Sequence, residues 1–227
     1  MNTLRTLAAG IAVAAFTILP AASHASNSVT TFHLTSDSEL DDVFPDSRNA
    51  FVAEGRIGDR SGSTAFEAGL GETAASAAAS GHHDWQRGVR EPFTIAFSKD
   101  RNLVVFALGN NTLTFAPKKG AEMVDIAIRA QALDAKASVG VADLIIGSRG
   151  IPDSSMAYGA NGLDILLIRG ASLQDGFLMT GFATLSWQGT APTQSKLAFQ
   201  IKVGEASASA PTANEATSWG KIKAKNK

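Results

Sequence analysis

The sequence predicts an all-β protein, an antiparallel two-sheet β-sandwich of the jelly-roll kind. Short apolar runs with a two-residue period recur along the chain, and clusters of Gly, Asn, Asp and Pro separate them. No segment carries a long apolar stripe at helical spacing. We expect about ten strands in one domain, because roughly 200 residues suffice for a single all-β core.

Residues 92–115 show this pattern most clearly and predict three consecutive strands. In the first strand, Phe93, Ile95 and Phe97 alternate with smaller residues. The second, 103–108, is apolar at every position, which predicts a strand inside a sheet with both faces covered. Turns rich in Gly, Asn and Asp connect the three strands.

The two ends of the chain differ from this pattern. Arg5, the apolar stretch 7–19 and the small residues before Ser26 predict a signal peptide over residues 1–25. The apolar stretch is shorter than the roughly 20 residues that span a bilayer. We therefore expect export to the periplasm or the extracellular space, a folded domain over 26–204 and no membrane span. Residues 205–227, rich in Ala, Ser and Thr and then in Lys, predict a disordered tail.

Composition limits the functions and the sources of stability that are open to this chain. The net charge of −1 provides no electrostatic footprint for nucleic acid. The chain has no cysteine, so its stability must come from the core and from sheet hydrogen bonds. No cofactor motif is present.

An acidic segment follows a short strand predicted around 31–34. Its carboxylates could ligate calcium, although the spacing lacks the glycine and the closing Glu of an EF-hand loop. The alternative is a solvated acidic loop. The calcium candidates are Asp37, Glu39, Asp41 and Asp42.

One candidate catalytic pair comes from a hairpin predicted over 50–57 and 64–70. A turn centred between residues 60 and 61 places Glu54 across from Glu67, about 5 Å apart at Cβ. This is near the spacing of the nucleophile and the acid/base of a retaining glycosidase. The alternative is a surface cluster in which Arg56 neutralises the two carboxylates. A register slip of one residue would put them on opposite faces.

The segment after this hairpin contains small residues and then two histidines. The run 73–80 is rich in Ala and Ser and predicts a loop or one short helix. Adjacent side chains of an extended segment point in opposite directions, so His82 and His83 cannot share a metal ion. We expect Trp85 to pack over a sheet.

Further strands are predicted downstream, separated by a loop over 150–162. The last strand carries Lys196 and Lys202, which indicates a half-exposed strand at a sheet edge. A bend is expected at Gly181. The predicted strands cover 123–133, 139–146, 163–168, 177–187 and 196–203.

Several short motifs together resemble the bacterial choice-of-anchor domains, most nearly the W type. They are FVAEGRIG at 51–58, AFE at 65–67, WQRG at 85–88, PFTI at 92–95, GLD at 162–164 and SKLAFQI at 195–201. The resemblance covers about residues 30–204 and implies an exported β-sandwich of the kind found in PEP-CTERM proteins, with no established catalytic residues. Residues 205–227 carry no Pro-Glu-Pro motif, hydrophobic helix or arginine cluster. The resemblance therefore does not imply anchoring by that route.

Three functions follow as hypotheses. The first is a non-catalytic module of the envelope or extracellular matrix that binds polysaccharide or a surface protein. The second is a carbohydrate-active enzyme that uses Glu54 and Glu67. The third is a structural matrix protein that self-associates through an unprotected edge strand. The sequence does not determine the oligomeric state.

Overall fold

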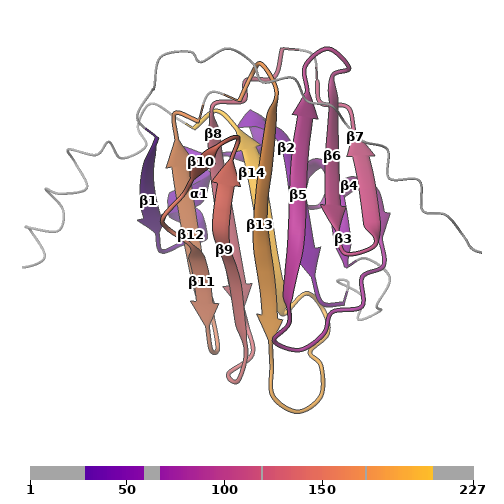
Figure 1. Cartoon of the computed structure of the whole chain (residues 1–227). Coiled ribbons are helices and arrows are strands. Elements are labelled where there is room, and N and C mark those ends of the chain that lie inside the picture. Colours follow the sequence, from indigo (N-terminus) through magenta and orange to yellow (C-terminus); the bar gives the residue numbers. More distant parts are fainter. Residues whose placement is uncertain (1–28, 59–66, 119, 172, 207–227) are drawn as a thin grey trace, which may run out of the picture.

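The computed structural model describes residues 29–58, 67–118, 120–171 and 173–206 (Figure 1). These residues form two antiparallel sheets of seven strands each, one short α-helix and one 3₁₀ turn. The predicted all-β, two-sheet sandwich is confirmed. The predicted signal peptide and nearly all of the predicted tail lie outside the described residues.

Sheet A contains strands from both ends of the described chain. Each neighbour in the sheet is antiparallel to the next. The strand order is β1 (Thr30–Leu34), β12 (Gly162–Arg169), β8 (Asp125–Ala132), β14 (Leu197–Gly204), β2 (Asn49–Arg56), β3 (Ala68–Thr73) and β4 (Ser76–Gly81).

Sheet B lies in front of sheet A in Figure 1. Its strand order is β10 (Arg149–Gly150), β9 (Ser138–Ile146), β13 (Phe177–Ser186), β5 (Arg90–Ser98), β6 (Leu103–Leu108) and β7 (Asn111–Phe115). A seventh strand, β11 (Ser155–Tyr158), also pairs with β9. The short strands β10 and β11 lie where the sequence predicted only a loop.

The core lies between the two sheets and is built from the inward residues of every long strand. An aromatic cluster occupies its centre, where the ring of Phe199 lies 6.2 Å from Trp85 and 6.1 Å from Phe93. A Cβ at Gly55 would lie only 2.4 Å from the Phe199 ring, so glycine is required there. Trp85 is buried as expected, and its indole N–H donates to the Arg56 carbonyl at 3.0 Å.

The predicted three-strand meander is present as β5, β6 and β7, but one expectation about it was wrong. Only one face of β6 is buried, because Val104, Phe106 and Leu108 point into the core. The alternate residues Leu103 and Val105 are half-exposed on the outer face, which no layer of the sandwich covers.

The prediction for the Ala- and Ser-rich run was also wrong, because most of this run forms the edge strand β4 rather than a loop or helix. Alanine favours a helix, but helix propensity is a weak determinant and pairing with β3 overrides it. Most of β4 is exposed, and its side chains are small throughout. Sheet A therefore ends in an edge without charge or proline.

The last strand was expected at an edge and instead lies in the middle of sheet A, between β8 and β2. The lysine that suggested an edge, Lys202, is 6% exposed. Its ammonium group donates to Asp46 at 2.8 Å, an ion pair that compensates for the burial.

The acidic segment forms a helix, α1 (Asp37–Val43), followed by the 3₁₀ turn η1 (Asp46–Arg48). Ser36 caps the helix by accepting a hydrogen bond from the Glu39 N–H at 3.1 Å. Leu40 and Val43 pack with Phe44 against Ile165 and Leu167 on the outer face of sheet A. The predicted solvated loop is therefore wrong, since this helix covers part of that face.

The expected bend at Gly181 is a local irregularity of β13. The pairing of β13 with β9 shifts register between Thr180 and Phe182. A Cβ at Gly181 would lie within 3 Å of the Phe93 and Leu144 side chains. Close packing of these side chains from β5 and β9 against β13 thus explains glycine at this position.

Candidate functional site

The hairpin register differs by two residues from the predicted one. Glu54 pairs with Gly69, and the Arg56 N–H donates to the Glu67 carbonyl at 2.9 Å. The predicted turn centre, between residues 60 and 61, lies outside the described residues. Glu54 and Glu67 are not directly opposed, so the pairing on which the glycosidase hypothesis depended is absent.

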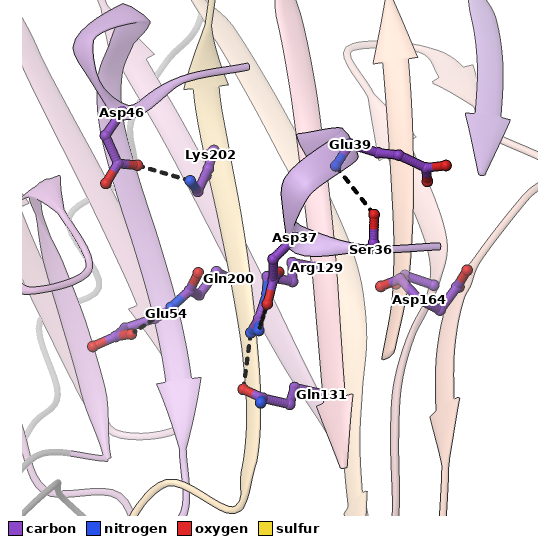
Figure 2. A network of polar contacts seen from close by, with 11 residues as sticks. Ser36, Asp37, Glu39, Asp46, Glu54, Arg129, Gln131, Asp164, Gln200 and Lys202 are labelled. Atoms are coloured by element: carbon purple, nitrogen blue, oxygen red, sulfur yellow. Dashed lines mark hydrogen bonds and ion pairs between the residues drawn. The ribbon is translucent and has the colours of Figure 1, made fainter. Parts of the chain in front are cut away.

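Glu54 belongs to a polar row on the outer face of sheet A (Figure 2). Its side chain is buried, and its carboxylate lies 3.2 Å from Arg56 and accepts from Gln200 Nε2 at 3.4 Å. The row continues across the sheet, because Gln200 pairs with Glu54 on one side and with Arg129 on the other. A carboxylate held by an adjacent guanidinium is neutralised locally.

Glu67 lies in a separate corner at the end of β4. It is 2% exposed, and its Oε2 lies 2.8 Å from His82 Nδ1 and accepts from the His83 N–H at 3.4 Å. The His82 carbonyl in turn accepts from Asn111 Nδ2 at 2.7 Å, which ties the corner to sheet B. Glu54 and Glu67 thus have different partners.

His83 is buried in the same corner. Its ring meets Trp85 edge-on, with the centroids 4.5 Å apart, and lies against Gly109 in the β6–β7 turn. Its Nε2 has no hydrogen-bond partner among the described residues. Burial lowers the pKa of His83, although Glu91, Asp84 and Glu67 partly oppose the effect and His82 adds to it.

The calcium candidates are dispersed by the helix. Arg129 donates to both oxygens of Asp37, at 2.6 and 2.8 Å, and Glu39 accepts from the Thr35 N–H at 2.7 Å. Asp41 and Asp42 are exposed on α1. Within the described part of the chain, no three His, Asp or Glu residues lie close enough to hold a metal ion.

The ion pairs of this face also set the charge state of two carboxyl groups. Hydrogen bonds from Arg129 lower the pKa of Asp37, and the hydrogen bond from Lys202 lowers the pKa of Asp46. The outer face of sheet A is therefore occupied by helix α1 and by polar groups that pair with one another, as Figure 2 shows.

The outer face of sheet B is different, because no helix of the described residues covers it. The cross-strand pairs place Ile145, Thr180, Thr94, Ala107 and Thr112 in one row across five strands. Each of these residues is partly or fully exposed. Their alternate neighbours point into the core, so this row marks the outer side of the sheet.

A second row runs beside the first. It joins Leu178, Ala96, Val105 and Thr114. The first three are intermediate in exposure, and Thr114 is exposed. The sequence reasoning missed this surface because it assigned both faces of β6 to the interior. The sequence does indicate an exposed face in β5, because small residues alternate with Phe93, Ile95 and Phe97.

Among the strand residues that face outward, charge lies at one end of this face. Arg90 lies 4.1 Å above the Phe182 ring and pairs with Asp143. Strands β13 and β6 contain no charged residue. At the β11 side, Met156 and Tyr158 are 37% and 64% exposed. The surface can therefore make van der Waals contacts and hydroxyl hydrogen bonds over several strands without ionic interactions.

No protein-family model matches the chain, and no curated protein matches it. In the described residues, no helix is long and apolar enough to cross a membrane.

Proposed function

We propose that the chain is an exported, non-catalytic β-sandwich module that binds neutral polysaccharide through the outer face of sheet B. The observation that carries the proposal is the uncovered and nearly uncharged surface over β9, β13, β5, β6 and β7. Contiguous exposed surfaces of apolar and uncharged side chains are typical of interaction sites. The leader predicted from the sequence supports export to the periplasm or the extracellular space.

The chemistry of the face favours an uncharged, hydroxyl-rich polymer. Sugar rings present C–H faces that pack on aliphatic side chains such as Ala107 and Val105, and hydroxyls that pair with Thr94 and Thr180. An acidic polymer would need complementary positive charge, and Arg90 is already paired with Asp143. The resemblance to choice-of-anchor domains is consistent with this role and stays a prediction.

The test is binding to insoluble neutral polysaccharides such as cellulose, chitin and β-1,3-glucan by co-sedimentation. Thr94→Arg puts a charge in the middle of the face, and we expect it to weaken binding at least tenfold because the charge would be desolvated. Ala160→Arg, in an exposed turn, is the matched control and should bind like the natural chain. Failure to bind any of the three polymers, capture of a surface protein alone, or equal binding by both variants would contradict the proposal.

A second candidate function is self-association, which the edge of sheet A favours. Strand β4 is exposed and contains none of the charges or prolines that usually prevent strand addition. If β4 pairs with a second copy, sedimentation velocity will show a larger species at high than at low concentration. Ala78→Lys should then restore the monomer, whereas a monomer at both concentrations rules this candidate out.

A further inference from the structure

A hollow of about 440 Å³ lies at one end of the sandwich, away from both faces described above. It is lined by residues of the β5–β6 turn, of the segment before β8 and of the segment before β13. Its volume is within the range of small-ligand sites, about 300–1,000 Å³. The binding face on sheet B and the polar row on sheet A do not use these turns.

The floor of the hollow is the end of the core. Phe97 and Met123 line it, and both belong to the main hydrophobic cluster. Phe97 also packs on Phe177, with the ring centroids 6.3 Å apart. An apolar floor of this kind packs against the C–H face of a ring.

Hydrogen bonds between its three walls fix the shape of the hollow. Asn102 Nδ2 donates to the Pro117 carbonyl at 2.9 Å, and the Leu173 N–H donates to the Met123 carbonyl at 2.9 Å. Lys99 donates to Asp175 at 2.6 Å, and Gln174 donates to Glu122. Cross-links between all three walls mean that a ligand meets a site that is already formed, which reduces the entropy cost of binding.

The rim is polar and balanced in charge. Among the described residues, two cationic, two anionic and two amide side chains line the hollow, namely Lys99, Lys118, Asp100, Glu122, Asn102 and Gln174. Amides and carboxylates can bind the paired hydroxyls of a ring through two hydrogen bonds each. The described side chains of the rim carry no net charge, so they give no advantage to an anion or a cation.

We infer that this hollow binds one ring of a neutral saccharide, with Phe97 and Met123 under the ring and Asp100 and Gln174 on its hydroxyls. The choice of a saccharide among polyhydroxylated ligands rests on the proposed function. The existence of the hollow does not rest on the proposed function, because its lining residues are separate from the outer face of sheet B.

The test is titration of the full chain with glucose, galactose, N-acetylglucosamine and glucuronate, followed by protein-observed NMR. We expect saturable shifts with at least one neutral sugar at millimolar concentration, and weaker or no binding of glucuronate. Asp100→Asn should weaken binding about tenfold, because hydrogen bonds to a charged acceptor are about twice as strong as neutral ones. Ala121→Phe should abolish binding by filling the hollow, and Asp41→Asn, on α1, is the matched control.

The outcomes separate this inference from the proposed function. Thr94→Arg should leave monosaccharide binding unchanged, and Ala121→Phe should leave polymer binding by the outer face of sheet B unchanged. No saturable shift with any neutral sugar up to about 50 mM would overturn the inference, even if the polymer binds. Tighter binding of glucuronate than of neutral sugars, or full binding by folded Ala121→Phe, would overturn it as well.

Discussion

Replacing Phe199 with alanine is expected to lower the free energy of unfolding by about 3–5 kcal/mol. Phe199 lies on the central strand β14, is fully buried and contacts the rings of Trp85 and Phe93. The residues around it cannot close the cavity easily, because Gly55 already lies directly against the ring. Equilibrium unfolding in urea measures the loss, with an unchanged slope if the unfolded state is unaffected.

Two further variants make this expectation specific to burial. Phe199→Leu keeps most of the volume and should cost less than the alanine variant. Phe182→Ala removes the same ring from the outer face of sheet B, where it is partly exposed and contacts Arg90, and should cost no more than about 1 kcal/mol. Equal losses for Phe199→Ala and Phe182→Ala would mean that the core is not centred between the sheets as described.

The strands that the sequence predicted well are those with strong period-two alternation. Strands β5, β8 and β14 follow directly from alternation, and turn residues delimit the meander of β5, β6 and β7. Such strands have one face fixed by burial, so local sequence carries the information. What local sequence does not carry is the position of a strand within its sheet.

Position in the sheet explains two of the errors. Lys202 suggested an edge strand, but its partner Asp46 lies 156 residues earlier in the chain, and only the tertiary fold brings the two together. The apolar run of β6 suggested two covered faces, yet nothing in a strand says whether a second layer is present. The outer face of sheet B was missed for this reason.

The failure to predict helix α1 is a different kind of error, because the sequence does contain a pattern typical of a helix. Ser36 and Glu39 have the spacing of a helix N-terminus, and Leu40 and Val43 lie on one face. The many carboxylates of the segment outweighed this pattern in the sequence reasoning. The two-residue register shift at Glu54 had no such signal, because the register of a hairpin depends on its turn.

The second large effect concerns pH. Stability is expected to fall as the pH drops below about 6.5, the ordinary pKa of histidine, because His83 is buried and has a lowered pKa in the folded chain. The unfolded chain then binds a proton that the folded chain does not, so acid favours unfolding until the pH reaches the folded pKa of His83. Each pH unit within this window costs about 1.4 kcal/mol.

The two carboxyl groups with lowered pKa values act in a different pH range. The pKa values of Asp37 and Asp46 are lowered from 3.8, so their stabilising effect is complete above that pH and is lost only in stronger acid. Glu67, Asp84 and Glu91 face His83 and limit the size of its effect.

The His83→Leu variant isolates the contribution of His83. Leucine fills a similar volume between Trp85 and Gly109 and has no Nε2 to leave without a partner, so its stability at pH 8 should be within about 1 kcal/mol of the natural chain. Chemical unfolding from pH 8 to pH 5 should then show a smaller decline for His83→Leu than for the natural chain, since all other titrating groups are common to both. Parallel curves for the two proteins would show that protons do not distinguish folded from unfolded His83, and the buried corner would lose its role in acid sensitivity.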